Sequence, residues 1–152
     1  MNWRKGMRIG VSMCCLVVLP LLMGQGCPSG AGLGLPGGGD SGYVNVTPAE
    51  AQALIQSHLD DPSFVILDVR SAEEFAAGHI ENALSLCVLC SDPAFRAGVA
   101  DFDRSSTILV YCRTGRRSAT ASSIMVQEGF TNVYNMTGGF VGWQSLGLPA
   151  VQ

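Results

Sequence analysis

The sequence predicts an α/β fold of three layers, in which a mainly parallel, five-stranded sheet carries helices on both faces. Short apolar runs rich in β-branched residues alternate with segments of helical spacing, the pattern of a parallel sheet connected by helices. The two strongest runs, over residues 64–67 and 107–111, are continuously apolar, as in strands buried on both faces. Asp68 and Cys112 directly follow these runs, so we expect them at the carboxyl ends of strands, where such sheets bind ligands.

The domain should begin with a short strand and a capped helix. The strand is expected over residues 43–46. Thr47-Pro48-Ala49-Glu50 then supplies an N-cap, a proline at the first helical position and a capping-box glutamate. These signals predict a helix that runs to about His58, and the buried strand over residues 64–67 comes next.

The middle of the domain has the same kinds of pattern, a capped helix and a strand, but they are weaker. A second capping box, Ser71-Ala72-Glu73-Glu74, begins a short helix that Gly78 can end. A third strand is expected over residues 83–87, although its apolar pattern is weaker than that of the other strands. Pro93 then opens a helix that should extend to Val99.

The C-terminal part contains the strongest strand of the chain, over residues 107–111. Apolar residues at helical spacing predict a helix that starts at Ser118 and ends before Gly129, a natural C-cap. A last strand over residues 132–135 and a terminal helix over residues 140–145 complete the fold. The sequence has no internal repeat, and we expect one domain.

The N-terminal segment predicts export. Positively charged residues precede an apolar run over residues 9–23, and small residues close this run before Cys27. This order is typical of a secretory signal, and the run is shorter than the roughly 20 apolar residues that a transmembrane helix needs. Residues 28–42 contain seven Gly and two Pro and no hydrophobic periodicity. We therefore predict a signal peptide over residues 1–26, a Gly-rich tether over 27–42 and the folded domain over 43–152.

Cys27 resembles the lipidated cysteine of bacterial lipoproteins, because it directly follows the small residues of the signal. Gly24 departs from the leucine that the lipoprotein family prefers three residues before that cysteine. Three outcomes stay open: a lipid anchor on Cys27, cleavage without lipidation, and an uncleaved anchor. Each places the domain outside the cytoplasm, on the periplasmic side of the cell envelope. Pro28 stands where an aspartate would indicate retention at the inner membrane, which favours the outer membrane.

The charge pattern points to a small anion as ligand rather than to nucleic acid. All twelve acidic residues lie at Asp40 or later, whereas three of the nine basic residues lie in the signal. The remaining domain has six arginines, no lysine and no basic stripe, so nucleic acid is not an expected partner. Three of those six arginines crowd into residues 113–117, where a positive pocket would suit a small anion.

The segment Cys112-Arg113-Thr114-Gly115-Arg116-Arg117-Ser118 has the features of a reactive-cysteine loop. A cysteine reacts as the thiolate, and a helix N-terminus or nearby arginines lower its pKa. Here the loop leads into a helix, so its backbone N–H groups should converge on the sulfur, and Gly115 lets the backbone turn tightly. A single cysteine at the end of a strand is usually an inert buried thiol, but this combination favours a nucleophile.

This loop and several motifs spread through the domain resemble the single-domain rhodanese family. The loop follows that family's Cys-x-x-Gly-x-Arg-Ser form, and the resemblance covers about residues 44–149. The other motifs that carry it are Asp68-Val69-Arg70, Glu74-Phe75, Gly78-His79-Ile80, Asn82-Ala83, Gly138-Gly139-Phe140, Trp143 and Pro149.

The resemblance implies a rhodanese-like fold and a sulfurtransferase that needs no metal and no organic cofactor. Cys112 would take a sulfur atom from thiosulfate or a related donor, hold it as a persulfide and pass it to cyanide, a thiol or a partner protein. Arg113, Thr114, Gly115, Arg116, Arg117 and Ser118 would form the cradle of this persulfide. Within it, Arg117 would help to bind the substrate anion. Asp68, Arg70, Glu74 and His79 would hold the surrounding loops.

Two other functions compete with this one. Related phosphatases and arsenate reductases have a longer Cys-x5-Arg loop, whereas the spacing from Cys112 to Arg117 is Cys-x4-Arg, which suits sulfur better than a tetrahedral phosphate. The other alternative is a persulfide carrier or a non-catalytic rhodanese-like binding module. The intact loop around Cys112 argues against a module without chemistry but not against a carrier.

Cys87-Val88-Leu89-Cys90 is a second cysteine motif, and the sequence leaves its role open. It follows the third predicted strand, which can bring it near Cys112 in this fold. Metal binding would require about four ligands, and His58 and His79 are the only histidines. One alternative is a disulfide or a persulfide-resolving pair of auxiliary thiols, and another is ordinary packing of the two side chains. A metal site is the least favoured alternative.

Overall fold

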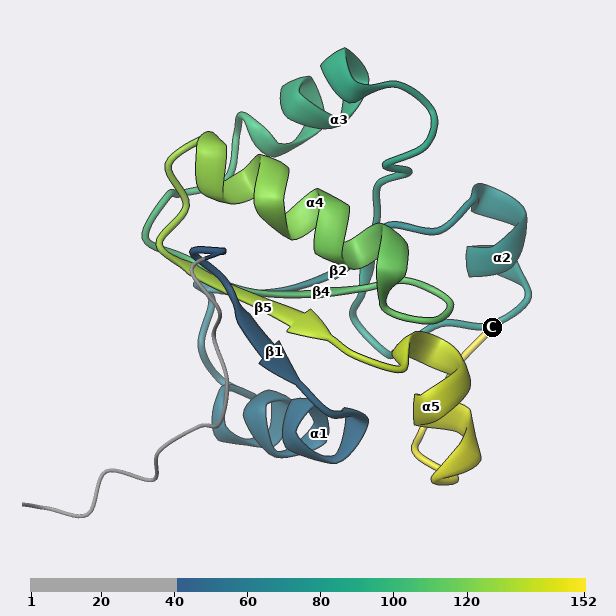
Figure 1. The fold of residues 1–152 in the computed structure, drawn as a ribbon. Helices are drawn as coiled ribbons and strands as arrows, with labels where there is room; N and C mark the ends of the chain where they lie inside the picture. The colour runs from purple at the N-terminus through teal and green to yellow at the C-terminus, as the bar shows by residue number, and fades with distance from the viewer. Residues whose placement is uncertain (1–40) are drawn as a thin grey trace, which may run out of the picture. The chain divides into compact units, whose positions relative to one another are not determined.

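The computed structural model describes residues 41–152, so the predictions for the signal, Cys27 and all but the last two residues of the tether lie outside the described residues. Its centre is a five-stranded sheet in which every pair of neighbouring strands is parallel. The spatial order is β1-β5-β4-β2-β3, which places β4 in the middle (Figure 1). The strands are β1 (Val44–Val46), β2 (Phe64–Asp68), β3 (Leu84–Ser85), β4 (Thr107–Tyr111) and β5 (Asn132–Met136).

Helices cover both faces of the sheet, which confirms the predicted three-layer α/β fold. Helices α3 and α4 lie on one face, and α1 and α5 lie on the other (Figure 1). The short helix α2 lies beside the end of the sheet where β4 stops. The helices are α1 (Pro48–Ser57), α2 (Ala72–Ala76), α3 (Asp92–Val99), α4 (Arg116–Gln127) and α5 (Gly139–Ser145).

Local capping explains where the first two helices begin. Thr47 and Ser71 each accept a hydrogen bond from the backbone N–H three residues later, and Glu50 and Glu74 bond back to the N-cap N–H groups. Both predicted capping boxes are therefore present. Each satisfies two backbone donors that the first turn of a helix leaves without an intrahelical partner.

Each face of the sheet has its own apolar core. Ile108 and Val110 of β4 point to the α3–α4 side, where Phe95 and Met125 are completely buried. The other residues of β4 point to the α1–α5 side, where Trp143 is 1% exposed. Every residue of β4 after its first is buried, as the continuous apolar run predicted.

The structure differs most from the predictions at β3 and at the start of α4, and the other ends agree to within one residue. β3 contains only Leu84 and Ser85, whereas a strand over residues 83–87 was expected, because the chain leaves the sheet after pairing with the end of β2. Helix α4 begins at Arg116 rather than Ser118, after Gly115 in the left-handed conformation. Within residues 41–152, no helix combines the length and apolar character that crossing a membrane requires.

Candidate active site

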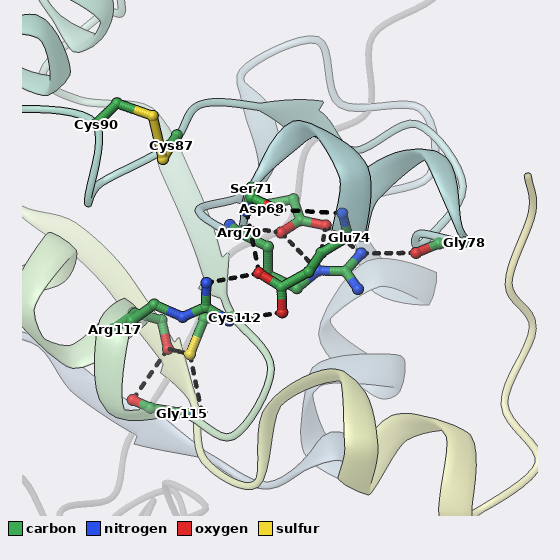
Figure 2. A network of polar contacts seen from close by, with 11 residues as sticks. Asp68, Arg70, Ser71, Glu74, Gly78, Cys87, Cys90, Cys112, Gly115 and Arg117 are labelled. Atoms are coloured by element: carbon green, nitrogen blue, oxygen red, sulfur yellow. Dashed lines mark hydrogen bonds and ion pairs between the residues drawn. A yellow bond between two sulfur atoms is a disulfide. The ribbon is translucent and has the colours of Figure 1, made fainter.

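Cys112 follows β4 directly, and its side chain is enclosed by the loop that comes after it. The residue is 1% exposed. Its Sγ accepts a hydrogen bond from the backbone N–H of Gly115 at 3.1 Å and one from the Ser118 hydroxyl at 3.5 Å. The loop thus curls round the sulfur, and the first turn of α4 closes it (Figure 2).

These hydrogen bonds favour the thiolate form of Cys112. Burial raises the pKa of the Cys112 thiol, because it removes the charged form from water. Hydrogen bonds from the Ser118 hydroxyl and from the backbone N–H groups of Ser118, Thr114 and Gly115 act in the opposite direction and prevail. The pKa of Cys112 therefore lies below its ordinary value, as a nucleophilic cysteine requires.

Backbone N–H groups of helix α5 donate hydrogen bonds to the Cys112 loop, a contact that the sequence did not indicate. The N–H of Phe140 donates to the Cys112 carbonyl at 2.8 Å, and the N–H of Val141 donates to the Arg113 carbonyl at 3.0 Å. In a trans peptide the carbonyl and the N–H point in opposite directions. Holding the Arg113 carbonyl against α5 therefore turns the N–H of Thr114 towards the sulfur.

Gly115 makes the turn possible because of its conformation and its surroundings. Its φ is +94°, a conformation that residues with a Cβ rarely adopt. A Cβ at this position would lie 3.1 Å from the Gly138 N and the Thr137 Cα. The loop around Cys112 therefore packs closely against the segment that joins β5 to α5.

The three arginines of the loop differ in their surroundings. Arg113 and Arg116 are exposed, whereas Arg117 is partly buried and forms a bidentate ion pair with Glu74 of α2, with Nη1–Oε2 and Nη2–Oε1 distances of 2.7 and 2.8 Å. Figure 2 shows Arg117 extending from the Cys112 loop to Glu74. Arg117 is thus neutralised by a partner 43 residues away, and its predicted role in anion binding stays a prediction.

The Glu74–Arg117 ion pair predicts acid sensitivity. Hydrogen bonds from Arg117 are the largest cause that lowers the pKa of Glu74, from 4.5 to about 2. Because the folded-state pKa is depressed, the stabilisation is fully present above about pH 4.5 and is lost as the pH falls towards 2. Above pH 4.5 we expect Glu74→Gln to lower the free energy of unfolding by about 2 kcal/mol, a value reduced for the partial exposure of the pair.

Urea unfolding of both proteins between pH 2 and 7 tests this prediction. The difference between parent and Glu74→Gln should shrink as the pH falls below 4.5. Glu73→Gln is the matched control, because Glu73 precedes Glu74 in α2 but is exposed and forms no ion pair among those of the described residues. A difference for Glu74→Gln that is independent of pH, or no larger than that of the control, would contradict the prediction.

Asp68 and Arg70 form a buried ion pair at the end of β2. Arg70 Nη2 donates to Asp68 Oδ2 at 2.6 Å and to the Gly78 carbonyl at 2.6 Å. The guanidinium also lies 4.2 Å from the centre of the Phe140 ring. Arg70 therefore connects β2, the end of α2 and the start of α5.

His79 contacts the loop after α2 rather than the sulfur. Its Nδ1 lies 3.1 Å from the Phe75 carbonyl, and its ring stacks on the Phe75 ring with centroids 3.8 Å apart. Its backbone forms an isolated bridge with Val151. His79 therefore contacts Phe75 and Val151, and its implied supporting role stays a prediction.

Ser118→Ala should raise the pKa of Cys112, because the variant loses the hydroxyl that donates to Sγ. We expect iodoacetamide to alkylate Cys112 several-fold more slowly at neutral pH, with the midpoint of the pH–rate curve moved upward. Ser122→Ala is the matched control, since Ser122 lies on the same helix and its buried hydroxyl has no hydrogen-bond partner among residues 41–152. An unchanged curve for Ser118→Ala, or equal shifts in both variants, would refute the role of this hydroxyl.

Cys87 and Cys90 form a disulfide, with their Cα atoms 5.5 Å apart. The structure therefore selects the disulfide among the alternatives that the sequence left open for this pair. Figure 2 places the disulfide outside the network of polar contacts around Cys112. Cys112 is the only free cysteine within residues 41–152, and no cluster of three or more His, Cys, Asp and Glu suited to a metal lies in that part of the chain.

Comparisons with known proteins agree with this geometry. A family model described as a rhodanese-like domain matches residues 48–146. The thiosulfate sulfurtransferase GlpE of Actinobacillus succinogenes is 31% identical over 107 residues, which cover 70% of this chain and 89% of that protein. A putative mitochondrial thiosulfate sulfurtransferase of Schizosaccharomyces pombe is 36% identical over 92 residues, which cover 55% of this chain and 65% of that protein. The crystal structure of a rhodanese-related protein from Thermoplasma volcanium matches with a TM-score of 0.58 and 26% identity, covering 72% of this chain and 98% of that one.

Proposed function

Since the chain belongs to the family of rhodanese-like domains, we propose that it is a sulfurtransferase in which Cys112 carries the transferred sulfur as a persulfide. One observation carries this proposal: a buried cysteine sulfur surrounded by N–H and O–H donors that lower its pKa. The same donors suit the charge of a persulfide, because a terminal sulfur anion accepts hydrogen bonds as a thiolate does. Relatives named thiosulfate sulfurtransferase support the same chemistry.

The proposed reaction has two displacements. The Cys112 thiolate attacks the outer sulfur of thiosulfate or a related donor, the S–S bond of the donor breaks, and sulfite leaves with the bonding electron pair. A second nucleophile then attacks the outer sulfur of the persulfide and releases the Cys112 thiolate. Cyanide serves as this acceptor in an assay, and a thiol is the acceptor we propose in the cell. The cysteine is itself the covalent carrier, so the cycle uses no other cofactor.

Mass spectrometry tests the first displacement. After incubation with thiosulfate, the peptide that contains Cys112 should gain the mass of one sulfur atom, and cyanide should then remove it as thiocyanate. Failure of Cys112 to gain sulfur would overturn the proposal. Sulfur that loads but passes only to one partner protein would instead identify a persulfide carrier. Hydrolysis of p-nitrophenyl phosphate at a comparable rate would favour the phosphatase alternative, which the Cys-x4-Arg spacing disfavours.

We further propose that the domain works outside the cytoplasm, attached to the envelope by a lipid on Cys27. The support is the order of charged, apolar and small residues before Cys27. Expression of the full chain in a Gram-negative host with labelled palmitate tests this directly. A mature protein that starts at Cys27 and carries label is the expected result, and an unlabelled or uncleaved chain would contradict it.

A further inference from the structure

A single residue, Val69, connects the Cys87–Cys90 disulfide loop to the Cys112 loop. Val69 follows β2 directly, and its N–H donates to the Tyr111 carbonyl at 2.9 Å. Its own carbonyl accepts a hydrogen bond from the N–H of Val88 at 3.5 Å. Val69 thus joins the residue before Cys112 to the residue after Cys87. The two segments are two strand spacings apart, or roughly 10 Å.

The disulfide loop and the Cys112 loop also share a face and a pocket. Cys112 and Val88 belong to the same apolar cluster on the α3–α4 side of the sheet. A pocket of about 560 Å³ separates the two loops, and its lining includes Val88 and Leu89 of the disulfide loop and Arg116 and Arg117 of the other. The pocket therefore lies between the disulfide loop and the first turns of α4, and Cys112 itself is not among its lining residues.

The disulfide is placed where an external reductant can reach it. Cys90 is exposed and Cys87 is partly buried. Two residues separate the cysteines, the spacing of many redox-active pairs, and an accessible disulfide exchanges with external thiols. Leu89 lies between them and lines the pocket, and its apolar side chain is 70% exposed to solvent.

We propose that Cys87 and Cys90, when reduced, take the sulfur from the Cys112 persulfide within the same chain and release it as hydrosulfide. This inference rests on the proposed function, because it requires the persulfide on Cys112. The acceptor is the cysteine pair and the product is hydrosulfide, whereas transfer to cyanide gives thiocyanate. The Cys87–Cys90 disulfide in the structure is the form in which this reaction would leave the pair.

The proposed steps balance in atoms and electrons. One thiolate of the pair attacks the outer sulfur of the persulfide, and the S–S bond to Cys112 breaks, which restores the Cys112 thiolate. The other thiolate then attacks the cysteine sulfur of the new persulfide, hydrosulfide leaves, and the Cys87–Cys90 disulfide forms. The two thiols supply two electrons, which reduce the sulfane sulfur to sulfide. An external dithiol reductant returns the pair to the thiol form by thiol–disulfide exchange.

The transfer requires the disulfide loop to move over the pocket. Cysteines that form an S–S bond have Cα atoms about 4.4–6.8 Å apart, and one additional sulfur extends this reach by about 2 Å. The spacing of roughly 10 Å estimated from the sheet therefore has to shorten. Reduction removes the covalent constraint on residues 87–90, and closure would bury Leu89 against the apolar part of the pocket, which includes Ile124.

The test compares two redox forms of the same protein. The chain is reduced with dithiothreitol, freed of reductant without air, and given one equivalent of thiosulfate in the absence of cyanide. We expect roughly one hydrosulfide per chain, with a Cys87–Cys90 disulfide found afterwards by peptide mass spectrometry. The oxidised form should keep its sulfur on Cys112 and release no hydrosulfide. The first-order rate constant should not depend on protein concentration, because the transfer occurs within one chain.

The double variant Cys87→Ser/Cys90→Ser separates this inference from the proposed function. It should load sulfur on Cys112 and form thiocyanate with cyanide as the parent does, but release no hydrosulfide. If the variant and the parent both load sulfur and the reduced parent releases no more hydrosulfide than the variant, the inference fails and the proposed function stands. If Cys112 never loads sulfur in either protein, the proposed function fails. A rate constant that rises with protein concentration would overturn transfer within the chain.

Discussion

Replacing Gly139 by alanine is expected to abolish most sulfur transfer and to lower the free energy of unfolding by about 3 kcal/mol or more. Gly139 starts α5 with a φ of +57°. A Cβ there would lie 2.6 Å from the Arg113 carbonyl carbon and from the Thr114 N, and closer still to the Cys112 carbonyl oxygen. These are backbone atoms of the loop that holds the sulfur, so they cannot rotate away as a side chain would.

Two penalties therefore add at Gly139. The left-handed conformation costs a residue with a Cβ roughly 1–2 kcal/mol, and forcing the loop away from α5 adds roughly 1–3 kcal/mol. The second penalty also displaces the carbonyls of Cys112 and Arg113 from the N–H groups of α5. Loss of that alignment turns the Thr114 N–H away from Sγ, which is why activity should fall with stability.

Gly147→Ala is the matched control for Gly139→Ala. Gly147 also has a positive φ, +65°, but a Cβ there would meet nothing within 4 Å. We expect Gly147→Ala to lower the free energy of unfolding only by the cost of the left-handed conformation and to keep its activity. Urea unfolding and the thiocyanate assay compare the two variants. Equal losses in both would show that contact with the Cys112 loop contributes nothing.

Cys112→Ser should reduce thiocyanate formation by at least about 1000-fold while the protein stays folded. A serine hydroxyl is not ionised in the neutral range and cannot hold a sulfane sulfur. Its oxygen accepts the hydrogen bonds from Gly115 and Ser118 that Sγ accepts now, so the free energy of unfolding should change by less than about 1 kcal/mol.

The thiocyanate assay and urea unfolding of Cys112→Ser are measured together. Residual turnover above the background reaction of thiosulfate with cyanide would mean that another group carries the sulfur. Cys112→Ala provides a second inactive variant in which no oxygen enters the loop. If either variant unfolds before the assay temperature, persulfide formation on the parent still decides the role of the cysteine.

Most of the fold could be predicted because its signals are local. The capping boxes at Thr47 and Ser71 fix two helix starts within four residues of sequence, and the run over residues 107–111 is apolar throughout. The position of Cys112 followed from that strand. β3 was overestimated because the chain leaves the sheet after Ser85, and the apolar residue Leu86 packs against the core outside any strand.

The contacts that complete the site could not be predicted because they join distant parts of the chain. Glu74 was expected in a capping box, but its ion pair with Arg117 spans 43 residues and leaves no pattern in the sequence. The support that α5 gives the loop depends on backbone N–H groups, which every residue except proline possesses. The pair Gly138-Gly139 is visible in the sequence, and a glycine pair indicates a close approach of two backbone segments. The sequence does not say which segment approaches Gly139.

The backbone origin of the donors around Sγ also makes the loop a candidate for redesign. Gly115 and Thr114 hold the sulfur through N–H groups, whereas the side chains of Arg113, Thr114 and Arg116 face solvent. Residue types at these three positions can therefore be exchanged without removing a donor from the sulfur. A library varied only there would alter the charge and shape presented to incoming acceptors while preserving the nucleophile. Enzyme engineers could thus select new acceptors on an unchanged reactive centre.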